Sequence, residues 1–145
     1  TLKSGGRLML SIENRYDYKM FCGLKDPHSG TYFTTIMSRS MANIVSKFAK
    51  NRAYRPWIYS FRELKELLQK AGFRSVKLHA CWPDYRFPDY IAPYGRTKEN
   101  FIPISTFRNG SRSVRRIIAN RLEWLVFKRL NLDWCAPSII AIAEK

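Results

Sequence analysis

The sequence lacks several features that would assign a function at once. No apolar run approaches the roughly 20 residues that a membrane-spanning helix needs. The three cysteines, Cys22, Cys81 and Cys135, lie far apart, and neither a Cys-x-x-Cys nor a His-x-x-x-His pair is present. A zinc site or a disulfide framework is therefore not expected. These absences predict a cytoplasmic protein with reduced thiols and no metal site.

Acidic residues are scarce relative to basic ones. The chain has 11 Asp and Glu against 26 Lys and Arg, which gives a formal net charge of +15. A charge of this size raises the encounter rate with polyanions, so nucleic acid, an anionic membrane surface and an acidic substrate all fit as partners. No RNA-recognition consensus, zinc finger or helix-turn-helix signature occurs, which makes nucleic acid the less favoured of the three.

Three short segments have the apolar character of strands, at residues 7–12, 74–81 and 138–143. The first is almost continuously apolar, which is typical of a strand covered on both faces in a doubly wound α/β sheet. Two other segments, residues 13–37 and 82–110, have no sustained period and contain Gly and Pro. They predict two long loops, and structured loops of that length are often functional.

Apolar side chains at helical spacing predict three helices, over residues 40–50, 61–71 and 111–130. The second has the clearest boundaries, because Ser60 and Glu63 form a capping box and Gly72 is a typical stop. In the third, we expect one face to point inward and the basic face to be solvated or to lie on anionic lipid head groups. The inward residues would be Val114, Ile118, Leu122, Leu125 and Val126.

The first strand follows the turn Leu2-Lys3-Ser4-Gly5-Gly6, which resembles the Leu-Lys-Pro-Gly-Gly turn before the fifth strand of class I S-adenosylmethionine-dependent methyltransferases. Other motifs resemble a subgroup of that family associated with cell-surface polysaccharide synthesis. They are Ile12-Glu13-Asn14-Arg15, the segment Gly23–Gly30, Pro83–Pro88, Tyr59–Leu64 and Ala71-Gly72-Phe73.

The resemblance implies a partial Rossmann-like methyltransferase sheet with flanking helices. Residues 7–12, 74–81 and 138–143 would be its fifth, sixth and seventh strands, with the seventh inserted antiparallel between the other two. Residues 1–145 would match only the C-terminal part of the domain, because no Gly-x-Gly-x-Gly cofactor loop occurs. The cofactor-binding N-terminal half would be absent, and the fifth strand would be an exposed edge open to association with another chain.

The function implied by the resemblance is methyl transfer from S-adenosylmethionine to a saccharide or glycan-related acceptor. This chain would supply the acceptor side of the site and would be inactive alone. Ligands of open α/β sheets bind at the carboxyl ends of parallel strands, so Glu13, Asn14 and Arg15 are candidate substrate-binding residues. The alternative is that Glu13 and Arg15 pair with each other or cap the loop.

The two loops supply the other candidates. His28 can take a proton near neutral pH, and Asp26 is placed to orient its ring, so the pair is a candidate for catalysis. Tyr85 could stack on a sugar, and Arg86 could bind a carboxylate or phosphate, in a loop stiffened by Pro83 and Pro88. The alternatives are a loop histidine bonded to nearby backbone and a rigid connector with solvated charges.

Two other functions fit the same residues. The chain could be a non-catalytic basic module that binds nucleic acid or an anionic membrane, with aromatic support from Tyr54 and Trp57. Its cations would be Arg52, Arg55, Arg112, Arg115 and Arg116. It could also be an inactive, truncated remnant. The residues alone do not identify the methyl acceptor, the acceptor atom or the oligomeric state.

Overall fold

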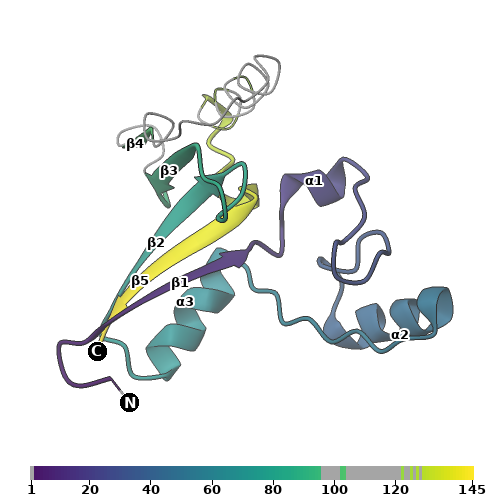
Figure 1. Cartoon of the computed structure of the whole chain (residues 1–145), viewed down its shortest axis with the longest axis horizontal. Helices are drawn as coiled ribbons and strands as arrows, with labels where there is room; N and C mark the ends of the chain where they lie inside the picture. The colour runs from purple at the N-terminus through teal and green to yellow at the C-terminus, as the bar shows by residue number, and fades with distance from the viewer. Residues whose placement is uncertain (1, 96–101, 104–121, 123–124, 126, 128) are drawn as a thin grey trace.

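The computed structural model describes residues 2–95, 102–103, 122, 125, 127 and 129–145, and over these the chain is an α/β protein (Figure 1). The elements are β1 (Arg7–Glu13), α1 (Tyr18–Phe21), α2 (Arg39–Lys50), α3 (Phe61–Lys70), β2 (Ser75–Trp82), β3 (Tyr90–Pro93), β4 (Ile102–Pro103), the short 3-10 helix η2 (Asp133–Cys135) and β5 (Ser138–Glu144). Among these described residues, no helix has the length and apolar content needed to cross a bilayer.

The strands form one sheet with the order β1-β5-β2-β3-β4, and every neighbouring pair is antiparallel. The C-terminal strand β5 lies between β1 and β2, so that Ile139 is opposite Ile12 on one side and Ala80 on the other (Figure 1). The three predicted strands are confirmed, as is the antiparallel insertion of the last one between the first two. Because both neighbours run antiparallel to β5, β1 and β2 are parallel to each other.

The prediction of a three-stranded sheet with an irregular segment over 82–110 is wrong, because β3 and β4 both lie in that segment and add two strands to the sheet. Residues 90–93 form β3, which pairs with β2 and extends the sheet beyond it. The strand is short and ends at Pro93, so its sequence lacks the alternating run that identifies longer strands. Proline is tolerated there because a strand end does not need every backbone N–H for the ladder.

The core lies between α3 and one face of the sheet. Phe61, Leu64 and Leu68 of α3 are buried against strand residues that include Trp82 and Ile139. Met9, on the opposite face of β1, is exposed, so the prediction of a first strand covered on both faces is wrong for the described residues. β1 is also an edge strand of the sheet, as predicted.

Helix α3 begins as its sequence predicts. The Ser60 hydroxyl accepts a hydrogen bond from the Glu63 amide, and the Glu63 carboxylate accepts one from the Ser60 amide. The helix stops before Gly72, whose φ of +89° is the left-handed conformation that glycine adopts without strain. The helix N-terminus lies next to the end of β1, where the Arg15 amide donates a hydrogen bond to the Tyr59 carbonyl.

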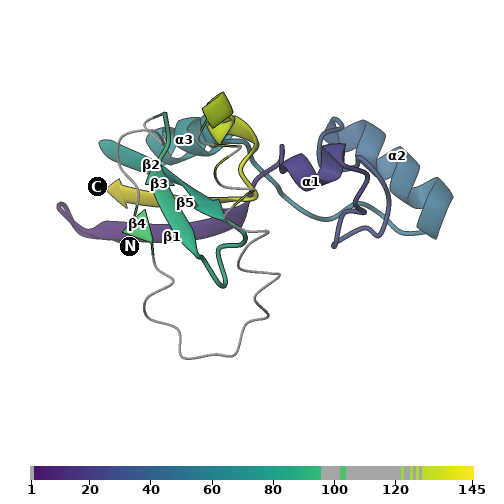
Figure 2. The same ribbon diagram turned by 90° about the horizontal axis from the view of Figure 1, so that it is seen from above.

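Helices α1 and α2 belong to an arm, residues 16–59, that extends from the end of β1 away from the sheet (Figures 1 and 2). The predicted helix over residues 40–50 is confirmed as α2. The arm returns to the sheet at Tyr59, which forms an isolated bridge with Asn14. Both ends of the arm therefore lie at the carboxyl end of β1.

Most of the helix predicted over residues 111–130 lies outside the described residues, including Val114, Ile118 and Val126. Leu122 and Leu125, which were predicted to face inward, are more than half exposed. Phe127 is buried in their place, with its ring in edge contact with Tyr18. At the described positions, the buried side chain is therefore Phe127 and not Leu122 or Leu125.

Candidate functional site

A cleft of about 1340 Å³ lies where the carboxyl end of β1 meets the arm. One wall is the end of β1, Ser11–Glu13, and a second is the loop 28–30. The end of α2 with residues 50–58 forms a third wall, and Tyr85 lines the cleft from the β2–β3 connection. The two segments predicted to be functional loops therefore both reach the cleft.

The central polar contact of the cleft joins Glu13 to His28. The His28 Nε2 atom lies 2.6 Å from the Glu13 Oε2 atom, and both side chains are partly exposed. An ionised carboxylate only accepts hydrogen bonds, so Nε2 carries the ring proton in this contact. In the neutral ring, the lone pair is then on Nδ1, which can take a proton from a bound molecule. Glu13 is thus a positioning group for the His28 ring.

Asp26 does not orient the His28 ring, contrary to the prediction. Its carboxylate is fully buried and accepts hydrogen bonds from the His28 backbone amide, at 2.8 Å, and from the hydroxyls of Ser29 and Thr34. A carboxylate that bonds the amide two residues on forms an Asx turn. Asp26 therefore shapes the loop that presents His28. Burial, together with the charge of Asp26, raises the pKa of the nearby Tyr54 phenol.

Asn14 does not face the cleft as a substrate ligand. It is only 2% exposed, and its side-chain amide donates hydrogen bonds to the Trp134 and Ala136 carbonyls, both at 2.8 Å. Its side-chain oxygen accepts a bond from the Tyr16 amide. The side chain of Asn14 is thus fully used by the Trp134 and Ala136 carbonyls and the Tyr16 amide. It ties the start of the arm to the segment before β5.

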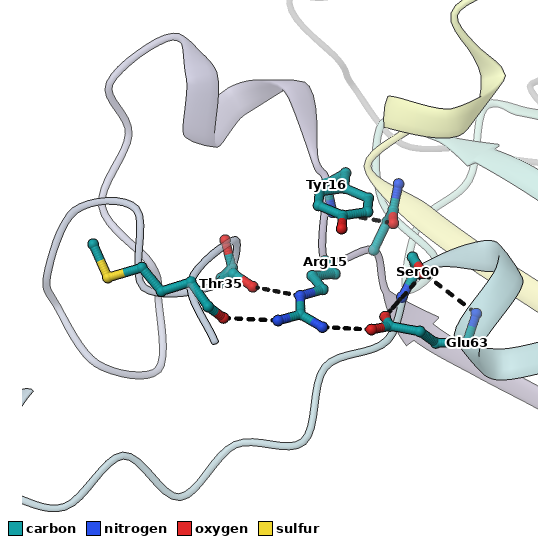
Figure 3. A network of polar contacts seen from close by, with 7 residues as sticks. Arg15, Tyr16, Thr35, Ser60 and Glu63 are labelled. Carbon is teal, nitrogen blue, oxygen red and sulfur yellow. Dashed lines mark hydrogen bonds and ion pairs between the residues drawn. The ribbon is translucent and has the colours of Figure 1, made fainter. Parts of the chain in front are cut away.

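Arg15 is also used within the fold (Figure 3). Its guanidinium donates to the Thr35 and Met37 carbonyls at 3.1 and 2.7 Å. A third nitrogen lies 2.5 Å from the Glu63 carboxylate at the start of α3. Arg15 thus joins the arm to α3, and the alternative that it pairs with Glu13 is also not observed. The substrate contacts predicted for Asn14 and Arg15 are corrected to structural ones.

The Arg15–Glu63 contact leads to a prediction about acid stability. Burial acts to raise the pKa of Glu63, but the Ser60 hydrogen bonds and the Arg15 charge outweigh it, so the pKa is lowered. A carboxyl with a lowered folded pKa stabilises the fold above its unfolded pKa, and this stability is lost as the pH falls. We expect the melting temperature, measured by circular dichroism, to decrease as the pH is lowered from about 5 to about 3.

Glu63→Gln should flatten that pH dependence, because glutamine does not titrate over this range. Glu66→Gln, which removes an exposed carboxylate of the same helix, is the matched control. An acid dependence of equal steepness in Glu63→Gln and the unmodified protein would contradict the assignment.

Tyr85 lines the cleft, and Arg86 lies beside it, near Glu13. The Arg86 amide donates to the Asp84 carboxylate, a tight turn that holds this connection in place. The Arg86 guanidinium lies 4.0 Å from the Glu13 carboxylate and contacts the Tyr85 hydroxyl at 3.3 Å. Because Arg86 is largely exposed, it can turn toward an anionic group in the cleft without losing a buried contact.

The cleft is more basic than the predicted site residues suggest. Lys50, Arg52 and Arg55 line it, and Glu13 is the one acidic residue among the described lining residues. Arg52 and Arg55 were assigned to the binding-module alternative, whereas Lys50 was not predicted to be functional. Its position at the end of an amphipathic helix gives no sign that it borders the end of β1. Over the described part of the chain, no group of three or more His, Cys, Asp or Glu side chains could hold a metal ion.

We compared the chain with protein families, curated proteins and solved structures. No protein-family model, no curated protein and no solved structure matches the chain.

Proposed function

We propose that the chain forms the acceptor side of an S-adenosylmethionine-dependent methyltransferase that acts in the cytoplasm on a saccharide or glycan-related acceptor. The strand order carries the proposal, because β5 lies antiparallel between β1 and β2 as in the fold that the sequence motifs resemble. The position of the cleft adds support, since it lies at the carboxyl end of β1, where open α/β sheets bind their ligands.

The residues of the cleft suit an acceptor that bears hydroxyl groups. The Tyr85 ring offers a flat surface for a sugar, and Arg86 can bind an anionic substituent. When an acceptor hydroxyl lies against His28, the Nδ1 lone pair takes the proton of that oxygen as the oxygen is methylated. Glu13 holds the ring in the required tautomer and stabilises the positive charge that develops on it.

The described residues do not form a cradle for the cofactor itself. Glu13 is the one carboxylate among the described residues that line the cleft, and its Oε2 atom is already held by His28. The sequence also contains no Gly-x-Gly-x-Gly loop to approach the cofactor closely. In this reaction class S-adenosylmethionine supplies the activated methyl group. We propose that its binding residues lie in a part of the enzyme that packs along the open edge of β1.

Isothermal calorimetry with S-adenosylmethionine tests the proposal. We expect no binding by residues 1–145 alone and binding by a chain extended upstream in its reading frame, because the extension would supply the missing carboxylate and glycine loop. Failure of the extended chain to bind would overturn the methyltransferase proposal and favour an inactive remnant. Binding by residues 1–145 alone would contradict the placement of the cofactor site.

A second candidate function is polyanion binding, which the basic lining of the cleft favours. Lys50, Arg52 and Arg55 line the cleft with Trp57, whose ring is exposed and is stacked on the Arg39 guanidinium. Polyanion binding weakens steeply with salt because counterions are released, whereas binding of a neutral saccharide does not. A salt titration with single-stranded DNA therefore separates the two functions.

A further inference from the structure

Helix α2 is predicted from an apolar stripe of Met41, Ile44, Val45 and Phe48, and it exposes all of them except Val45, which is half-buried. Met41, Ile44 and Phe48 lie at helical spacing, and they are 57%, 54% and 90% exposed. The buried residues of the helix are the small ones, Ala42 and Ser46. Amphipathic helices normally turn their large apolar side chains to the core, so the orientation of α2 is reversed.

The reversed orientation is built into the arm. The Ser38 hydroxyl caps the start of α2, and Asn51 ends it in the left-handed conformation. The Asn43 side chain accepts a hydrogen bond from the Tyr54 amide, which fixes the segment after the helix against it. In both views α2 lies on the arm away from the sheet (Figures 1 and 2). The stripe is therefore held on an outer surface by contacts on the other side of the helix.

The part of the arm that carries the stripe has charge of one sign, and Lys50, Arg52 and Arg55 lie on its cleft side. No acidic residue occurs between Asp26 and Glu63, a stretch that contains the whole of α2 and the return of the arm. Its exposed cations include Arg39, Lys47, Lys50, Arg52 and Arg55. Trp57 is 68% exposed, and the Arg39 guanidinium lies 3.7 Å from the centre of its ring. The cations thus lie on the polar side of α2 and the large apolar side chains on the other, which is the arrangement of helices that lie on an anionic membrane surface.

The exposed apolar side chains and the cations of the arm together indicate which kind of partner covers α2. A second copy of the chain would bring two strongly cationic arms together, and nucleic acid would match the cations but leave three large apolar side chains in water. An anionic membrane surface matches both, because its head groups attract the cations and its acyl boundary accepts the apolar side chains. We infer that α2 lies on an anionic membrane surface, with Met41, Ile44 and Phe48 inserted at the acyl boundary. The inference does not depend on the proposed methyltransferase function.

Flotation with lipid vesicles tests the inference on the full chain. We expect binding to vesicles of phosphatidylcholine and phosphatidylglycerol in equal amounts, and little binding to phosphatidylcholine alone. The double variant Ile44→Ser/Phe48→Ser should bind at least about 10-fold more weakly, because insertion scales with buried apolar area. The matched control is Met9→Ser/Leu67→Ser, which removes two exposed apolar side chains on β1 and α3 and should bind normally.

The cations need a separate variant. Lys47→Gln/Arg52→Gln should weaken binding to the anionic vesicles about 10-fold, whereas Lys65→Gln/Lys70→Gln on α3 should not. Phe48→Trp reports insertion of this side chain directly, because the variant is expected to keep its binding to vesicles. Its fluorescence should shift to the blue on addition of anionic vesicles, beyond any shift of the unmodified protein.

Several results would overturn the inference. One is equal vesicle binding by Ile44→Ser/Phe48→Ser and its control. Another is binding to duplex DNA that is lost with Lys47→Gln/Arg52→Gln but kept in Ile44→Ser/Phe48→Ser, which would assign the surface to nucleic acid. A dimer in sedimentation analysis that Phe48→Ser abolishes would assign it to a second copy. Unfolding of the α2 variant, with no blue shift in Phe48→Trp, would place the stripe in the folded core.

Discussion

Glu13→Gln is expected to lower the rate of methyl transfer about 100-fold, within the range of positioned general acid–base catalysis. The Glu13 carboxylate accepts a hydrogen bond from the Nε2–H group of His28. In the neutral ring this leaves the lone pair on Nδ1. A glutamine amide can turn its N–H toward Nε2, which places the ring proton on Nδ1 and blocks proton removal there. The loss should appear in kcat with little change in KM, because Glu13 acts through His28 and not on the acceptor.

The assay follows transfer of a labelled methyl group from S-adenosylmethionine to a saccharide fraction. It uses the extended chain, which is the form expected to bind the cofactor. His28→Ala should match the loss in Glu13→Gln, since both remove the same proton acceptor. Arg86→Ala should raise KM in contrast, and Glu66→Gln, at an exposed ion pair of α3, should leave both constants unchanged. If Glu13→Gln stays near the unmodified rate while His28→Ala is inactive, Glu13 has no role in setting the tautomer.

Asn14→Asp is expected to lower the free energy of unfolding by about 3 to 5 kcal/mol, the range for an uncompensated buried charge. The side-chain amide of Asn14 faces two carbonyl oxygens, those of Trp134 and Ala136, at 2.8 Å. A carboxylate cannot donate to them, and its charge is repelled by both. Asn14→Ala should lose about 2 to 3 kcal/mol, because it leaves the same carbonyls and the Tyr16 amide unsatisfied but adds no charge.

Urea unfolding at neutral pH, followed by circular dichroism, measures both losses. Gln69→Glu makes the same amide-to-carboxylate change at an exposed position of α3 and should stay within about 0.5 kcal/mol of the unmodified protein. A loss below about 1 kcal/mol in Asn14→Asp would mean that the site relaxes to admit water, and that Asn14 does not tie the arm to the segment before β5.

Local chemistry explains why much of the fold could be predicted. The capping box at Ser60 and the stop at Gly72 need only residues within one helix, and the structure confirms both. The runs at 7–12 and 138–143 are apolar enough to identify buried or half-buried strands. β3 was missed because four residues that end in proline carry no periodic signal.

The candidate site could be predicted only in part, because residue type does not show which way a side chain points. Glu13, Asn14 and Arg15 are consecutive and all suit substrate binding. In the structure Glu13 lines the cleft, Asn14 is buried, and Arg15 bonds the arm to α3. Likewise Asp26, two residues from His28, bonds its backbone, whereas the ring partner lies 15 residues away on β1.

The sequence by itself determined the strands β1, β2 and β5, the helices α2 and α3, the charge, and the position of polar residues after the first strand. These depend on side-chain periodicity and on bonds between near neighbours. The tertiary structure alone decided that Glu13 meets His28, that Lys50 borders the same cleft, and that the apolar stripe of α2 faces outward. Each of these depends on how the arm returns to the sheet, and contacts between distant segments are not encoded in any local pattern.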